Sequence, residues 1–348
     1  FIPLFFIFDS DVLPKNKYRL LYITFFIFHG LTNWWISSWR AETDPFLMAS
    51  GIVLWLFHPF FFMVPFALTF LIKKRIGNRA AFLAFPFAWS LFEWAHSLSD
   101  LSYPWLTLGA TQLYNKYWVQ FIDITGVWGA SFLIVFSNVI LYYLYRNFKL
   151  HKMEGKPAST FFANVPNLIL LALLLLPNGA AKFYGLAQFS EFEHEKLLKE
   201  NKSIKIGVIQ PAVNPWRKWD RDGVAQIYKH INIMDSLNRT VPGLDMCIWS
   251  ETAFPYLGLG INAYHDYGFL RDYLNRSGLS LMTGFSELDI YESGETIPPT
   301  AKYFRNDSNM RYDTYNAALM LNPNQLNMKP KLYRKSRLTP FAEKMPFA

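Results

Sequence analysis

The first half of the chain is a series of long apolar segments separated by short polar ones. A helix that crosses a bilayer needs about 20 mostly apolar residues. Residues 1–8 have the composition of the end of one such span. Five further segments reach or approach the required length: 18–39, 46–72, 80–98, 117–145 and 161–177. Residues 1–177 are therefore predicted to form a polytopic α-helical membrane domain.

Basic residues alternate between the loops of this domain. One set comprises the segment before the first full span, the loop between the second and third spans, and the loop between the fourth and fifth. It holds eleven Lys or Arg residues: Lys15, Lys17, Arg19, Lys73, Lys74, Arg75, Arg79, Arg146, Lys149, Lys152 and Lys156. The other set holds only Arg40 and Lys116. Loops rich in Lys and Arg stay in the cytoplasm. Five spans that start inside end outside, so the chain after about residue 178 is predicted to face away from the cytoplasm.

The pattern changes after a polar connector at 178–202. Short apolar runs of strand length then alternate with segments of helical period, which is typical of an α/β domain at 203–348. The predicted strands are 204–210, 246–249, 281–285 and 317–321, and the predicted helices are 221–239 and 266–276. Residues 287–314 are polar and rich in turn formers, which predicts a surface insertion.

Composition agrees with a membrane protein. Hydrophobic residues make up 52% of the chain and charged residues 17%, against about 25% charged in a typical soluble domain. The net charge of +8 lies in short loops and indicates topology better than a nucleic-acid partner. The single cysteine, Cys247, excludes an intrachain disulfide framework and a Cys-cluster zinc site. The sequence has neither metal-ligand spacing nor a Gly-rich phosphate loop, so no metal and no cofactor is predicted.

Two segments of the second half carry candidate chemistry. In Ile248–Pro255 a buried strand runs directly into Glu251, and in 331–343 a Tyr-Arg-Lys ending at Lys335 precedes a Leu-Thr-Pro-Phe and then Glu343. Each alone has an ordinary interpretation, a surface carboxylate at a strand end and a solvated basic loop. A carboxylate and a lysine that each follow a strand together indicate acyl chemistry.

This combination resembles the nitrilase (carbon–nitrogen hydrolase) superfamily, whose Glu–Lys–Cys triad lies on an αββα sandwich. It resembles most the membrane-tethered branch, the apolipoprotein N-acyltransferases. Three further motifs are similar to that branch and fall in the same order: Tyr103–Gly109 with Gln112, Gln210–Pro215 with Lys218-Trp219-Asp220, and Tyr315-Asn316. The implied fold is a polytopic helical membrane domain followed by an α/β nitrilase-like domain that is truncated at its C-terminus.

The resemblance also implies roles for individual residues. Glu251 would be the general base, Lys335 would offset the negative charge of the tetrahedral intermediate, and Glu343 would tune both. Trp219 would line the acyl pocket, although a packed core tryptophan is an equal alternative. Tyr315 and Asn316 are interpreted as structural.

The implied reaction moves an acyl chain from a phospholipid to a cysteine and then to the N-terminal cysteine amine of a diacylated apolipoprotein. The implied place is the bacterial inner membrane, with the catalytic domain on the periplasmic side. The family's nucleophilic cysteine follows the lysine motif, so it is expected beyond Ala348. Cys247 lies in the middle of an apolar run, where cysteine is usually an inert small hydrophobe.

Two other functions stay open. A membrane-anchored nitrilase-type amidase would use water as the acceptor, and a transporter or channel could carry an accessory soluble domain. Glu93, His96 and Asp123 lie in or near spans, where ionisable residues are often functional. Glu93 and His96 share a helical face and could contact a lipid headgroup or form an internal pair. His58 is expected to be a lone structural histidine.

Overall fold

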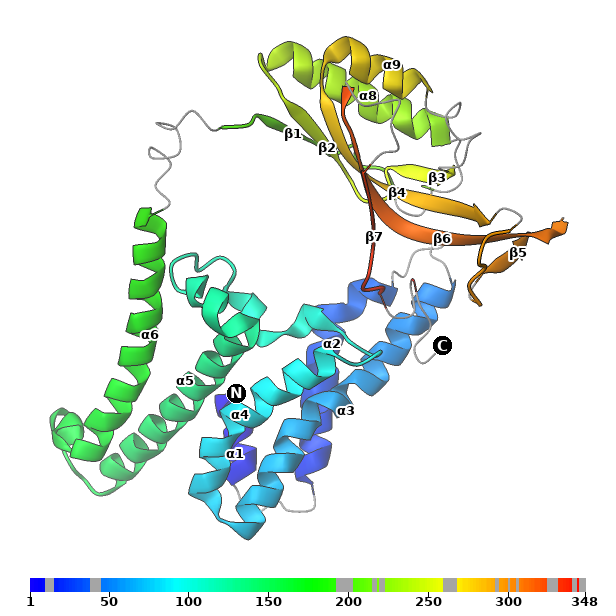
Figure 1. The fold of residues 1–348 in the computed structure, drawn as a ribbon. Helices are drawn as coiled ribbons and strands as arrows, with labels where there is room; N and C mark the ends of the chain where they lie inside the picture. The colour runs from blue at the N-terminus through cyan, green and yellow to red at the C-terminus, as the bar shows by residue number, and fades with distance from the viewer. Residues whose placement is uncertain are drawn as a thin grey trace. The chain divides into compact units, whose positions relative to one another are not determined.

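The chain forms two compact units in the computed structural model (Figure 1). Unit 1 comprises Phe1–Leu197 with Thr339–Ala348, and unit 2 comprises Leu198–Leu338. The structure describes residues 1–9, 16–37, 45–191, 203–214, 218, 223–258, 268–291, 294–299, 301–304, 307–323, 331–339 and 343.

Unit 1 is helical. Its helices are α1 (Ile2–Asp9), α2 (Lys17–Asn33), α3 (Pro45–Arg75), α4 (Asn78–Ser97), α5 (Ile122–Met153) and α6 (Val165–Glu191). Short 3-10 turns accompany them at Trp34–Ser37, Pro104–Leu106, Leu108–Gln112, Val119–Phe121 and Ala158–Ala163.

Three of the described helical segments are long and apolar enough to cross a membrane: Leu47–Arg75, Val119–Met153 and Val165–Phe189. Helices α2 and α4 coincide with two more of the predicted spans, whose crossing stays a prediction. Helix α6 continues through Pro177 to Glu191, past the end predicted for the last span.

An aromatic core joins α1, α3, α4 and α5. The rings of Phe5 and Phe85 lie 5.2 Å apart edge to face, and those of Phe8 and Phe82 lie 4.8 Å apart. Trp89 is also buried there. The outer faces of the same bundle expose large apolar side chains such as Phe87 and Leu83. Apolar surface on both sides of a helix is unfavourable in water but suits a lipid environment.

Unit 2 is built on a seven-stranded sheet. Its strands are β1 (Ile206–Ile209), β2 (Met246–Trp249), β3 (Phe254–Gly258), β4 (Ser280–Tyr291), β5 (Lys302–Phe304), β6 (Asp307–Leu321) and β7 (Lys331–Arg334). The order is β1-β2-β4-β6-β5, with β3 also beside β4 and β7 also beside β6. Strands β1 to β4 pair in parallel, whereas β5, β6 and β7 pair antiparallel.

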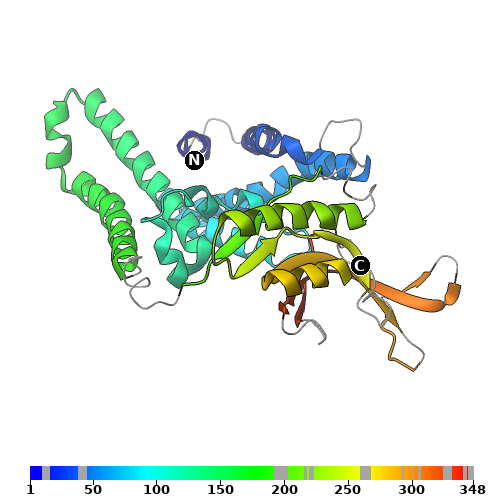
Figure 2. The same cartoon turned by 90° about the horizontal axis from the view of Figure 1, so that it is seen from above.

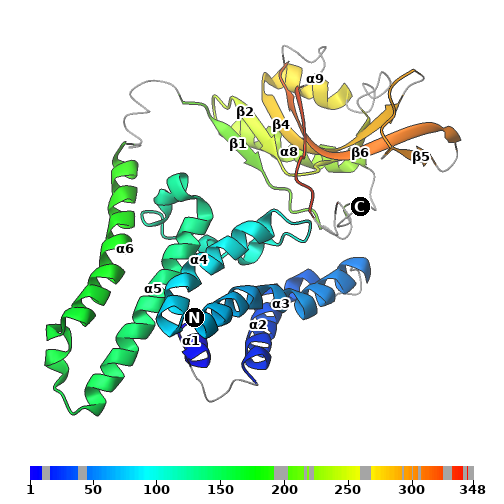
Figure 3. The ribbon, with the colours of Figure 1, turned by 60° about the horizontal axis from the view of Figure 1, so that its bottom comes forward.

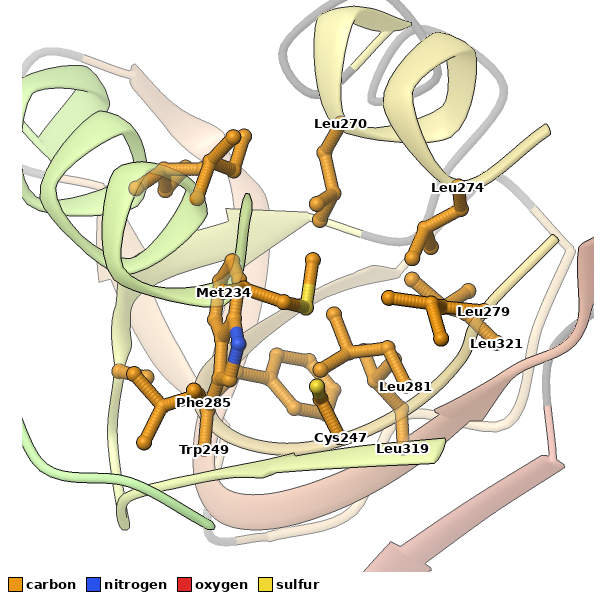
Figure 4. Packing of buried hydrophobic residues seen from close by; sticks show 14 of the residues in the cluster. Met234, Cys247, Trp249, Leu270, Leu274, Leu279, Leu281, Phe285, Leu319 and Leu321 are labelled. Carbon is orange, nitrogen blue, oxygen red and sulfur yellow. The ribbon is translucent and has the colours of Figure 1, made fainter. Parts of the chain in front are cut away.

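Helices α8 (Gly223–Thr240) and α9 (Gly268–Ser277) cover one face of this sheet (Figures 1 and 2). Figure 4 shows Met234 of α8 and Leu270 of α9 packed against Cys247 and Leu281 of the strands. Side chains of a strand alternate between its faces. The neighbouring Met282 is therefore exposed on the face opposite the helices.

Residues 287–314 do not form the surface insertion that their polarity predicts. Strands β4 and β6 make one long hairpin that pairs from Leu281 with Leu321 to Tyr291 with Arg311 (Figures 1 and 3). Its polar side chains bond to one another, since the Tyr291 hydroxyl donates to Asp313 at 2.9 Å. Strand β3, which follows Glu251, was not expected either; the sequence indicated a loop there.

Candidate active site

Glu251 lies in the turn that follows β2, where the sequence places it. The turn rests on β4, because the Ala253 amide donates to the Gly284 carbonyl at 2.9 Å. The carboxylate extends toward solvent, with a side chain that is 66% exposed. A carboxylate at this edge can exchange a proton with a bound molecule.

Lys335 approaches the Glu251 carboxylate from a different strand of the sheet. It follows β7, and its amide donates to the Asn316 carbonyl on β6 at 2.8 Å. Its Nζ lies 3.5 Å from Glu251 Oε1. An ion pair this exposed contributes only about 0–1 kcal/mol to stability. The structure thus brings together the two side chains that the motifs singled out, in a pair that adds little to folding.

Asn316 is the residue that the sequence reasoning undervalued. Its Nδ2 donates to Glu251 Oε1 at 2.5 Å, while its main chain holds Lys335. We expected a structural residue here. Strand alternation was the available signal, because the next residue, Ala317, is buried beneath the helices and Asn316 must then face the other way.

A cavity of about 280 Å³ opens beside this group. It lies on the sheet face opposite α8 and α9, and apolar side chains form most of its wall. The lining residues are Ile248, Trp249, Glu251, Met282, Thr283, Gly284, Asn316, Ala317, Ala318, Tyr333 and Lys335. An apolar wall with a carboxylate, an amide and an ammonium at one end suits a carbonyl compound that has a hydrocarbon part.

The Tyr-Arg-Lys motif serves two purposes. Arg334 faces the opposite side from Lys335 and makes a two-pronged ion pair with Glu287 at 2.7 Å and a further one with Asp289 at 2.7 Å. The hydrogen bonds that Arg334 donates to Glu287 raise the pKa of its guanidinium. Arg334 therefore fastens β7 to the long hairpin, which fixes the position of the next residue, Lys335.

The Cys247 side chain points away from the Glu251–Lys335 group. It is fully buried in β2 on the helix-covered face, whereas its neighbour Ile248 lines the cavity. Burial raises the pKa of the Cys247 thiol to about 11. A thiol that is buried and protonated at neutral pH is a poor nucleophile.

Glu343 and Trp219 are the remaining predicted site residues. Glu343 belongs to unit 1, where its carboxylate accepts a hydrogen bond from the Thr339 amide at 2.7 Å. Trp219 lies outside the described residues. The roles given to both stay predictions.

Two acidic residues of the helical unit, Glu93 and Asp123, have partners within that unit. Glu93 Oε1 accepts hydrogen bonds from Trp89 Nε1 at 2.9 Å and from the Leu108 amide at 2.8 Å. Asp123 accepts from the Tyr184 hydroxyl at 2.6 Å. Glu93 is thus an internal structural acceptor rather than one half of a pair with His96.

The expectation of a lone histidine at His58 is wrong. Its Nδ1 lies 2.7 Å from Nε2 of His29, and its ring stacks edge-on against that of His96 at 5.1 Å. These residues come from three different helices, so the association could not be read from spacing. Within the described ranges, no group of three or more His, Cys, Asp or Glu side chains is arranged to hold a metal ion.

The chain is similar to known proteins over most of its length. Residues 1–140 match the family model described as the apolipoprotein N-acyltransferase N-terminal domain. The apolipoprotein N-acyltransferase of Chlorobaculum tepidum is 28% identical over 334 residues, which cover 95% of this chain and 57% of that protein. That of Borreliella burgdorferi is 25% identical over 351 residues, 100% of this chain and 59% of that protein.

The resemblance to the apolipoprotein N-acyltransferases is confirmed. The enzyme of Geobacter metallireducens adds a match of 26% identity over 250 residues, 70% of this chain and 44% of that protein. The chain spans about half the length of these N-acyltransferases. Their similarity extends beyond the helices that the family model matches, into the unit that carries Glu251 and Lys335.

Proposed function

We propose that the full-length protein is an apolipoprotein N-acyltransferase of the bacterial inner membrane. The observation that carries the proposal is the Glu251–Lys335 pair, 3.5 Å apart at the mouth of an apolar cavity. The similarity of the chain to named N-acyltransferases supports acyl transfer as the reaction in which this pair acts. The donor is a phospholipid, the acceptor is a diacylated apolipoprotein, and no cofactor takes part.

The first half-reaction forms a thioester. Glu251 takes the proton from a cysteine thiol, and the thiolate attacks the ester carbonyl of the phospholipid. The oxyanion of the tetrahedral intermediate develops beside the Lys335 ammonium, which lowers its energy. When the intermediate collapses, the ester C–O bond breaks and the lysophospholipid oxygen takes the proton from Glu251.

The second half-reaction uses the same groups in reverse. The α-amine of the apolipoprotein's N-terminal cysteine attacks the thioester, and Glu251 accepts a proton from the nitrogen. The C–S bond then breaks, Glu251 returns the proton to sulfur, and the product is an amide. The nucleophile is a cysteine that follows the lysine motif in the full-length protein, since Cys247 has neither the exposure nor the orientation for this step.

The rest of the site is assigned by the same resemblance. The sheet with α8 and α9 on one face is interpreted as one layer pair of a nitrilase-like αββα sandwich, and the cavity holds the acyl chain. Glu343 acts on Lys335 and on the base, and Trp219 lines the acyl pocket. The alternation of basic loops, eleven residues against two, supports a periplasmic position for this unit.

Substitution in the full-length protein tests the two catalytic residues. Glu251→Gln should abolish the thioester because the thiol loses its base. Lys335→Ala should lower the rate of acyl transfer by about 100- to 1000-fold, the usual cost of one transition-state donor. Lys335→Arg should fail as well, because a planar guanidinium does not replace a compact ammonium.

Matched controls come from the same unit. Lys331→Ala removes an exposed lysine at the start of β7, and Glu295→Gln neutralises an exposed carboxylate; both should leave the rate unchanged. The acyl-enzyme is followed by mass spectrometry after incubation with labelled phospholipid, and hydroxylamine should release the label. Near-normal turnover of Lys335→Ala would refute the assignment, and release of free fatty acid in place of transfer would indicate an amidase-like hydrolase.

A further inference from the structure

The turn that carries Glu251 has a strained backbone. Thr252 has φ of +49°, in the left-handed region that side chains other than glycine, asparagine and aspartate rarely adopt. A strained residue persists only where its surroundings hold it in place, and such residues gather at functional sites. In this turn the surroundings are Lys218 on one side and Gly284 on the other.

Lys218 contacts the turn through its side chain and helix α8 through its main chain. Its Nζ donates to the Glu251 carbonyl at 3.0 Å and also to the Thr252 hydroxyl. The carbonyl of Lys218 in turn accepts a hydrogen bond from Gln226, a buried residue of α8. Burial lowers the pKa of Lys218, and the charge of Glu251 acts in the opposite direction. The lysine therefore links helix α8 to the turn.

Gly284 forms the floor beneath the turn. A Cβ atom at this position would lie 2.7 Å from Glu251 Cα and 2.8 Å from the Thr252 nitrogen. Both are backbone atoms, so they cannot rotate out of the way as the end of a side chain could. Only glycine lets the turn approach β4 closely enough for the Ala253 amide to reach the Gly284 carbonyl at 2.9 Å.

We propose that Lys218 and Gly284 are positioning residues, which hold the Glu251–Thr252 turn so that the Glu251 carboxylate faces Asn316 and Lys335. The proposal rests on the function proposed above, in which the Glu251 carboxylate is the general base and must be held in position. Both residues act through Glu251. Since a misplacement of about 1 Å can cost about 100-fold in rate, a turn held from both sides matters to catalysis more than to folding.

Replacement of the lysine tests the first contact in the full-length protein. Lys218→Met should lower kcat for acyl transfer about 10- to 100-fold while KM for phospholipid stays within about twofold, because substrate still binds but the base is misplaced. Lys205→Met is the matched control. The Nζ of Lys205 also donates to a main-chain carbonyl, that of Pro242 at 2.9 Å, in the same unit but outside the candidate site.

Replacement of the glycine tests the second contact without touching the lysine. Gly284→Ala should give the same loss of kcat at unchanged KM, and it decides the matter if Lys218→Met does not fold. Gly268→Ala is the control, because a Cβ at Gly268 would meet nothing within 4 Å. It should leave kcat unchanged.

Hydrogen exchange reports the turn independently of any acyl chemistry. The Ala253 amide should exchange faster in Lys218→Met and Gly284→Ala than in the wild type and the two controls. A wild-type protein that forms no acyl-enzyme would refute the proposed function, and the exchange rates would still decide the present inference. Unchanged exchange of Ala253 in both variants, or wild-type kcat in Lys218→Met, would overturn it.

Discussion

At the scale of single residues, neighbours in the sequence take opposite parts because strand side chains alternate. Arg334 fastens β7 to Glu287, whereas Lys335 turns to Glu251. The motifs therefore singled out Glu251 and Lys335, since both directly follow strands. They could not predict the amide that contacts Glu251, because Asn316 meets that carboxylate, 65 residues earlier in the chain, only when the sheet is formed.

The position of Cys247 predicts a thiol that does not react in the folded protein. Burial raises the pKa of this thiol to about 11, so it is almost entirely protonated at pH 8. Maleimide should fail to modify it near neutral pH and should react more readily as the pH rises toward that value. Peptide mapping after labelling measures this, with an exposed cysteine introduced as Thr314→Cys as the positive control. Rapid native modification of Cys247 would contradict the described burial.

At the scale of elements, hydrophobic periodicity located most of the sheet unit. Strand β2 has the predicted bounds 246–249, and helices α8 and α9 lie within a few residues of their predicted ranges. The long hairpin was missed because its strands carry charges, which usually mark a loop. Arg334 neutralises those charges from elsewhere in the chain, and a window of local sequence cannot contain that partner.

The layer between α8 and the sheet should be sensitive to lost volume. Met234 is fully buried there (Figure 4), so Met234→Ala should lower the free energy of unfolding of the sheet unit by about 2–5 kcal/mol. Met310→Ala provides the comparison, because Met310 is 41% exposed and should cost no more than about 0.5 kcal/mol. Denaturant unfolding followed by hydrogen exchange of α8 amides measures both. Equal effects of the two changes would mean that the packing is incorrectly described.

At the scale of the whole molecule, the high apolar content of the chain is explained by two units that suit different solvents, lipid and water. The helical unit exposes apolar side chains on its outer faces, and the sheet unit encloses a conventional apolar core. Charge in the loops and apolar length of the helices were readable from the sequence, because both are local properties. Contacts among His29, His58 and His96 were not readable, because three separate helices supply them.

Loop charge also predicts the topology. Cysteines introduced as Tyr114→Cys, between α4 and α5, and as Thr314→Cys, on β6, should react with an impermeant thiol reagent in intact spheroplasts. Cysteines introduced as Lys74→Cys and Glu154→Cys should react only after the membrane is opened. All four positions are exposed in the structure, so access through the membrane is the variable. Labelling of Lys74→Cys in intact spheroplasts would show that the orientation is the reverse of the predicted one.

The place of β7 in the strand order also has a consequence for the timing of synthesis. Glu251 and Lys335 are 84 residues apart, and Lys335 directly follows β7, the strand that pairs with β6. At bacterial elongation rates of about 5–20 residues per second, the base leaves the ribosome about 4–17 s before its partner. During that interval the nascent chain has the Glu251 carboxylate but not the Lys335 ammonium with which it pairs. The proposed acyl chemistry therefore cannot begin before β7 has been synthesised.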